Sequence, residues 1–223
     1  MSFDMTIKKN LDQITSSLPP HVTLVAVSKT KPLGDLMQAY QAGQRVFGEN
    51  KVQEMVEKYH LMPDDVQWHM IGHLQRNKVK YMAGFVDLIH GVDSLKLLTE
   101  IDKQAQKHNR VIKCLLQIKI ARETSKFGLP IQEAEALLSS ETFKSLKNVR
   151  IVGLMGMASF TTDKLQISKE FKTLKSNFDQ LKQQRKNLKI ISMGMSGDYK
   201  LAIDCGSTMI RVGSLIFGAR NYN

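Results

Sequence analysis

The chain has 223 residues, a formal net charge of +11, 42% hydrophobic residues and 24% charged residues. This length suits one domain with a substantial core, and the composition is that of a globular protein, not a disordered one. Cys114 and Cys205 lie far apart, which argues against a disulfide framework or a zinc site and favours the reducing cytoplasm. We see no apolar signal segment and no run of the ~20 apolar residues that a membrane span needs.

The positive charge raises the question of nucleic-acid binding, but its distribution argues against that function. Many basic residues gather between residues 164 and 189. Apolar residues recur among them at helical spacing, namely Ile167, Phe171, Leu174, Phe178 and Leu181. A basic, solvated face of an amphipathic helix accounts for this pattern. No helix-turn-helix, zinc-finger or RNP signature accompanies it, so we expect no nucleic-acid partner.

The sequence predicts an N-terminal helix, after which strands and helices alternate. Ile7, Leu11 and Ile14 share one helical stripe, which ends before Pro19 and Pro20. The expected strands are residues 23–29, 45–49, 67–72, 86–90, 111–119, 149–156, 189–194 and 208–212. The expected helices lie near residues 33–42, 51–60, 75–83, 94–107, 131–140, 164–187 and 198–204.

Eight strands alternating with helices specify either a (β/α)8 barrel or an open, doubly wound sheet. Nearly continuous apolar runs such as residues 111–119 suit parallel strands that are covered on both faces. The count of eight favours the barrel, and no G-x-G-x-x-G follows the first strand, where an open dinucleotide-binding sheet would place it. We predict one (β/α)8 TIM-type barrel domain over residues 1–223, with an extra N-terminal helix.

Lys29 lies at the carboxyl end of the first expected strand, after the apolar residues 23–27. Burial disfavours the charged form of a lysine, and the neutral amine is a nucleophile that forms a Schiff base with an aldehyde. Strand alternation puts Lys29 on the face of Val25 and Val27, and strand-end residues on this side of a barrel are often catalytic. The alternative is a lysine whose amine simply reaches out to water, as we expect for Lys31.

Two later loops carry glycine and serine at positions that suit an anion. Ser196, Gly197 and Asp198 begin a helix after the seventh strand, and Gly213 and Ser214 follow the eighth. Barrels frequently hold phosphate between these two loops, where helix amino termini present free N–H groups. An ordinary helix cap by Ser196 or Asp198 is the alternative.

Other polar residues adjoin the strands. Arg211 lies inside an apolar strand, where a permanent cation is costly, so it requires a structural ion pair or a ligand. His69 and His73 are separated by ~13 Å along an extended strand, too far to share one metal ion. We expect His69 to be a hydrogen-bonded core residue and expect His73 and Asn50 to line the mouth of the pocket, with no metal site.

Five stretches, taken together, resemble the pyridoxal phosphate homeostasis proteins, also described as the alanine racemase N-terminal-like family. They are VAVSKTK at 25–31, FGEN at 47–50, WHMIGHLQ at 68–75, MGMSGD at 193–198 and IRVGSLIFGAR at 210–220. Each motif alone is modest, but five in order over nearly the whole chain are highly specific. Lys126 also matches a family Lys-x-Gly, and we assign it no role beyond its loop.

The resemblance implies a (β/α)8 barrel that carries pyridoxal 5′-phosphate as a Schiff base on Lys29. The implied cofactor-binding residues are Lys29, Asn50, Ser196, Gly197, Arg211, Gly213 and Ser214. Of these, Ser196, Gly213 and Ser214 would contact the phosphate and Arg211 the pyridine nitrogen. The family is thought to hold and deliver the cofactor in vitamin B6 homeostasis, without an established catalytic turnover and hence without catalytic residues.

An amino-acid racemase dependent on pyridoxal phosphate is the alternative. Racemisation needs a base on each side of the ring, and Lys29 would be one of them. In full-length racemases the opposing tyrosine comes from a separate β domain, whereas this sequence ends five residues after Gly218. We therefore expect a cytoplasmic, monomeric carrier, with apo enzymes as recipients of the cofactor. A basic binding module unrelated to the cofactor is a third hypothesis.

Overall fold

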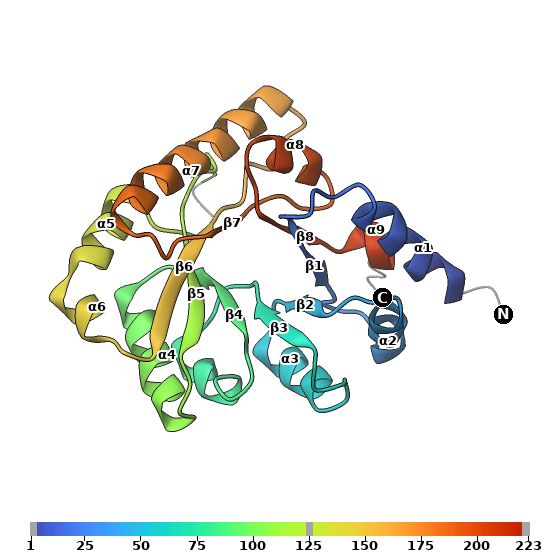
Figure 1. The fold of residues 1–223 in the computed structure, drawn as a ribbon, viewed down its shortest axis with the longest axis horizontal. Helices are drawn as coiled ribbons and strands as arrows, with labels where there is room; N and C mark the ends of the chain where they lie inside the picture. Colours follow the sequence, from blue (N-terminus) through green and yellow to red (C-terminus); the bar gives the residue numbers. More distant parts are fainter. Residues whose placement is uncertain (1–3, 124–126, 220–223) are drawn as a thin grey trace.

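Eight parallel strands close into a barrel in the computed structural model, which describes residues 4–123 and 127–219 (Figure 1). The strands are β1 Thr23–Val27, β2 Val46–Glu49, β3 Gln67–Met70, β4 Leu88–Val92, β5 Ile112–Gln117, β6 Val149–Met155, β7 Ile190–Ser192 and β8 Met209–Val212. Each strand pairs with the next along the chain, and β8 pairs with β1. The predicted TIM-type barrel is therefore confirmed, and the open sheet is excluded.

Helices follow the strands, as expected for a (β/α)8 fold. They are α1 Asp4–Thr15, α2 Leu33–Gln41, α3 Val52–Tyr59, α4 Leu95–Lys107, α5 Ile131–Ser139, α6 Glu141–Ser145, α7 Lys164–Gln184, α8 Tyr199–Asp204 and α9 Ser214–Phe217. The segment Arg76–Tyr81 (η1) is a 3-10 helix, not the expected α-helix, which suits so short a connector. The sequence pattern did not predict α6, which Ser140 caps by accepting a hydrogen bond from Phe143 N.

The N-terminal helix α1 is confirmed, and it packs against α2 and α9 (Figure 1). Its stripe of Ile7, Leu11 and Ile14 is buried. The long helix α7 buries the five apolar residues that the sequence pattern singled out and leaves most of its basic residues exposed. The concentration of positive charge between residues 164 and 189 is thus a solvated face of this helix.

Alternating side chains on the strands build two cores. The larger core lies between the strands and the helices. The smaller core fills the barrel with Val25, Leu88, Leu115, Met155 and Met209. Alternation along a strand sends successive side chains to opposite faces. The barrel is therefore filled, which leaves the loops after the strands as the place for a ligand.

Strand β1 ends at Val27, two residues earlier than predicted. Lys29 consequently lies in the turn that leads to α2 and not on the strand itself. Among residues 4–123 and 127–219, no helix combines the length and apolar character required to cross a membrane.

Candidate functional site

A cavity of about 630 Å³ opens at the carboxyl ends of the strands. Its volume is within the ~300–1,000 Å³ range of small-molecule and cofactor pockets. Its walls include every residue that the sequence nominated for cofactor binding, namely Lys29, Asn50, Ser196, Gly197, Arg211, Gly213 and Ser214. The fold thus brings together residues from both ends of the sequence around one space.

Lys29 is held in place through its neighbours in the turn. The buried amine of Lys58 on α3 donates to Ser28 O (2.7 Å) and to Glu49 Oε1 (2.8 Å). Ser28 Oγ donates to the same Glu49 oxygen (2.6 Å). Burial raises the pKa of the Glu49 carboxyl, while Lys58 and Ser28 counteract that shift. A buried ion pair therefore fixes the residue that precedes Lys29.

The residue after Lys29 is fixed from the same helix. Thr30 N donates to Glu54 Oε1 (2.5 Å), which also accepts from Lys58 Nζ (2.7 Å). Thr30 has a φ of 63°, a left-handed conformation that non-glycine residues adopt infrequently. Residues on both sides of Lys29 are thus anchored to α3. We refer to Glu49, Glu54 and Lys58 as the turn clamp.

The loops after β7 and β8 meet at the cavity. Ser196 Oγ accepts a hydrogen bond from Gly213 N (3.2 Å), which joins the two loops. A Cβ at Gly213 would lie 3.1 Å from Val27 O, so glycine permits the close approach of β1. Within the described part of the chain, the N–H groups of Gly197 and Ser214 have no protein acceptor. These two donors are available to an anion in the cavity.

Arg211 is buried inside the barrel and borders the cavity. Its guanidinium donates from Nη1 to Ser192 Oγ (2.6 Å) and from Nη2 to Gly156 O (3.2 Å). Burial lowers the pKa of Arg211 to about 10, and the negative charge of Asp198 opposes that shift. Arg211 therefore keeps its positive charge at neutral pH, with neutral acceptors on its protein side.

Asn50 and His73 both line the cavity, as the sequence led us to expect. Gly72 lies behind Asn50, where a Cβ would come within 2.5 Å of Asn50 O. The His73 ring stacks on Phe127, with ring centres 4.2 Å apart, and His73 Nδ1 lies 3.5 Å from Asp93 Oδ2. These contacts give the cavity mouth one aromatic wall.

His69 is a hydrogen-bonded core residue, which confirms the expectation: its Nδ1 lies 3.0 Å from His90 Nε2. The described residues contain no cluster of three or more potential metal ligands.

Sequence reasoning overlooked Lys58, His90 and Ser192. His90 and Ser192 are polar residues within apolar strands, which was an available signal. Lys58 follows Val52 and Met55 at a spacing of three on the buried face of α3. Lys126 lies outside the described residues.

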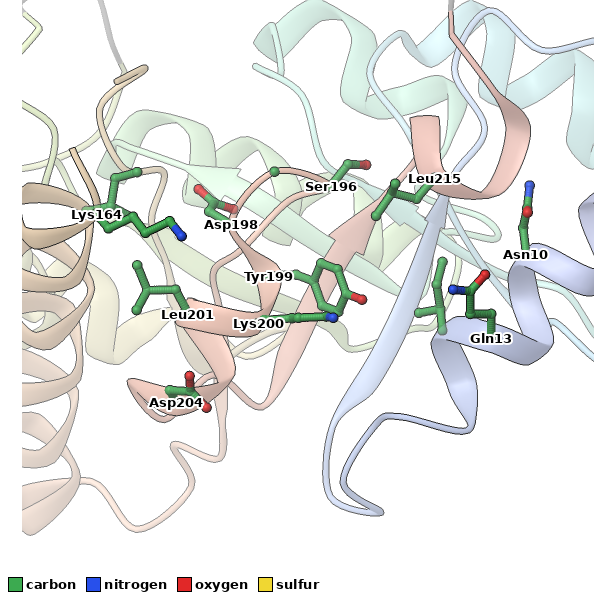
Figure 2. Close-up of a pocket in the computed structure, with 13 residues that line it drawn as sticks. Asn10, Gln13, Lys164, Ser196, Asp198, Tyr199, Lys200, Leu201, Asp204 and Leu215 are labelled. Carbon is green, nitrogen blue, oxygen red and sulfur yellow. The ribbon is translucent and has the colours of Figure 1, made fainter. Parts of the chain in front are cut away.

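A second cavity of about 680 Å³ lies where residues of α1, α7 and α8 meet the loop after β7 (Figure 2). Asn10 from α1, Lys164 from α7 and Tyr199 from α8 contribute to its walls. Ser196 and Gly197 line both cavities, so the two cavities adjoin at this loop.

Known proteins are similar to this chain in both sequence and architecture. Residues 5–221 match the alanine racemase N-terminal domain family. A pyridoxal phosphate homeostasis protein of Pasteurella multocida is 40% identical and aligns with 98% of this chain and 100% of its own length. One of Vibrio alginolyticus is 37% identical, with 98% and 99% covered.

Solved structures give the same result. PipY of Synechococcus elongatus without PLP superimposes with a TM-score of 0.89 at 38% identity, covering 95% of this chain and all of its own. The form with PLP bound gives 0.87 at 37% identity, with the same shares covered. Alanine racemase of E. faecalis gives 0.75 at 15% identity, covering 98% of this chain and 59% of its own, and shares the fold. The chain belongs to the alanine racemase N-terminal domain family, among the pyridoxal phosphate homeostasis proteins.

Proposed function

We propose that this protein binds pyridoxal 5′-phosphate and holds it as a reversible Schiff base on Lys29, within intracellular vitamin B6 homeostasis. The observation that carries the proposal is the convergence of all seven nominated residues on one cavity. The PLP-bound form of the similar PipY and the names of the curated relatives support the same cofactor.

The residues present fit the three polar parts of this cofactor. An aldehyde needs a primary amine, which Lys29 supplies at the cavity wall. A phosphate dianion needs several donors, and the free N–H groups of Gly197 and Ser214 come from the loops after β7 and β8. The ring nitrogen needs a polar partner, for which Arg211 is the buried candidate. When bound, the cofactor supplies an electrophilic carbonyl and an electron-withdrawing ring.

Arg211 favours holding the cofactor over strong carbanion chemistry. A guanidinium donates hydrogen bonds, and with a pKa of about 10 Arg211 keeps its proton at neutral pH. A pyridine nitrogen of the cofactor that accepts from Arg211 therefore stays unprotonated. Such a ring withdraws electrons less strongly than a protonated pyridine would. We infer that the protein stores the cofactor without turnover and delivers it to apo forms of enzymes that depend on pyridoxal phosphate.

Borohydride trapping tests the tether. We expect the protein incubated with pyridoxal phosphate to absorb in the visible range. Reduction with borohydride should place a pyridoxyl group on the peptide that contains Lys29. Lys31→Met is the matched control, because Lys31 lines the same cavity but its amine donates to Phe217 O (2.7 Å) and Ala219 O (3.1 Å). Labelling that survives Lys29→Met and disappears in Lys31→Met would contradict the proposal.

Hydrogen exchange at an amino acid separates storage from racemisation. We expect L-alanine deuterated at Cα to lose deuterium with the loaded protein no faster than with free pyridoxal phosphate, because stereoinversion needs a positioned base on each face of the ring. Proton NMR and chiral chromatography measure the loss of label and the D-alanine formed. Racemisation at an enzyme-like rate, ~1 per second or faster, would overturn storage without turnover.

The turn clamp generates a prediction about the placement of Lys29. Lys58→Met leaves the Glu49 carboxylate buried without its cation, and breaking a buried pair in this way costs about 3–5 kcal/mol. The double variant Glu49→Gln, Lys58→Met removes both charges of this pair and should recover most of the unfolding free energy, because the Glu54 carboxylate that also loses Lys58 is partly exposed to water. It should still bind pyridoxal phosphate more weakly than the wild type, because Ser28 O has lost its lysine donor.

Chemical denaturation and absorbance titration measure these two effects. Lys8→Met is the control, since Lys8 forms an exposed pair with Asp12 and should change neither quantity appreciably. A double variant that folds stably and binds the cofactor as tightly as the wild type would show that the clamp serves stability alone.

A further inference from the structure

A row of polar contacts crosses the barrel from the cavity to the opposite end. Arg211 Nη1 lies 2.6 Å from Ser192 Oγ, which lies 3.0 Å from His90 Nδ1. His90 Nε2 lies 3.0 Å from His69 Nδ1, and His69 Nε2 faces Asp87 Oδ2 at 3.6 Å. We refer to these five residues as the barrel relay.

The central contact of the relay passes through the barrel interior. Ser192 is on β7 and His90 is on β4, and these strands are not neighbours in the sheet. Ser192 and His90 are fully buried, and His69 is nearly so. Asp87, directly before β4, has a side chain that is 36% exposed. The relay therefore runs from the cavity to Asp87, which contacts solvent at the amino ends of the strands.

The chemistry at the Arg211 end is compatible with one direction for every hydrogen bond of the relay. Arg211 only donates, so Ser192 Oγ accepts from it. The hydroxyl hydrogen of Ser192 remains to donate to His90 Nδ1, which accepts when it is unprotonated. The neutral His90 ring carries its hydrogen on Nε2 and donates it to His69 Nδ1.

The Asp87 end selects this assignment. Asp87 is an acceptor, and its contact with His69 lowers the pKa of its carboxyl, so it is ionised at neutral pH. His69 must therefore carry its hydrogen on Nε2, facing Asp87, and leave Nδ1 to accept from His90. The Asp87 end thus selects one tautomer for both rings, and the Arg211 end accommodates it.

Both rings stay neutral near pH 7. Burial lowers the pKa of His69, with Asp87 acting to raise it and Lys113 to lower it. Burial also lowers the pKa of His90, and the adjoining His69 and Arg211 act in the same direction. Neutral rings with fixed tautomers suit a static positioning role and not storage of a proton.

We propose that Ser192, His90 and His69 are positioning residues that hold the Arg211 guanidinium toward the cofactor ring. This role rests on the proposed function, because it assumes a ligand in the cavity. Arg211 uses two of its nitrogens for Ser192 and Gly156. These two bonds orient the planar guanidinium and leave its remaining N–H donors to other acceptors. The hydroxyl of Ser192 cannot rotate away from this arrangement without giving up its bond to His90.

The first test determines the tautomers of His69 and His90 and needs no cofactor. In nitrogen-15 NMR of the histidine rings, we expect His69 and His90 as neutral rings protonated on Nε2 at pH 7. Ser192→Ala should shift the Nδ1 resonance of His90, because that nitrogen loses its donor. A His90 ring protonated on Nδ1, or an imidazolium, would overturn the relay.

The second test reads the affinity for pyridoxal phosphate. We expect Ser192→Ala to weaken binding about tenfold, since a hydrogen bond to a charged group is lost, and to shift the absorption maximum of the bound cofactor. Ser207→Ala is the matched control: Ser207 is equally buried but donates to backbone carbonyls such as Met193 O (2.7 Å). Ser207→Ala should lower the free energy of unfolding without changing the affinity for pyridoxal phosphate or the absorption maximum of the bound cofactor.

A double-mutant cycle completes the test. His90→Leu removes the acceptor of the Ser192 hydroxyl, so combining it with Ser192→Ala should weaken binding by less than the product of the two single effects. Wild-type protein that binds no pyridoxal phosphate would overturn the proposed function. Wild-type binding that Ser192→Ala leaves unchanged in affinity and spectrum would overturn the positioning role alone.

Discussion

The pairing of β8 with β1 is the constraint on which the rest of the structure depends. Its register sets Val25 opposite Arg211 and Ala26 opposite Val212. Two residues at opposite ends of the sequence, Lys29 and Arg211, therefore border the same cavity. Without barrel closure, the proposed tether and the proposed ring partner would sit on opposite edges of an open sheet.

Closure of the barrel also buries charged side chains. Arg211, Glu49 and Lys58 are buried charges, and a charge in a protein interior requires compensation. Glu49 and Lys58 compensate each other and fix the turn around Lys29. Arg211 instead contacts neutral acceptors on its protein side. A ligand acceptor on its cavity side would use the donors that these contacts leave over.

Sequence periodicity predicted the barrel because strands covered on both faces are apolar runs, and all eight appear within about two residues of their predicted bounds. It also nominated residues that line one cavity, because polar and glycine residues after buried strands gather at one end of a barrel. It missed the Ser192–His90 contact, which joins residues 102 positions apart. It also placed the end of β1 too late, since the anchoring of Ser28 and Thr30 to α3 depends on tertiary contacts.

A crystal structure of the protein grown with pyridoxal 5′-phosphate tests the central claim most directly, because it locates all three polar parts of the ligand at once. The account predicts continuous density from Lys29 Nζ to the cofactor, with the phosphate at the loops of Gly197 and Ser214 and the ring nitrogen beside Arg211. A cofactor attached to another lysine, or one that lies with its phosphate against Arg211, would contradict it.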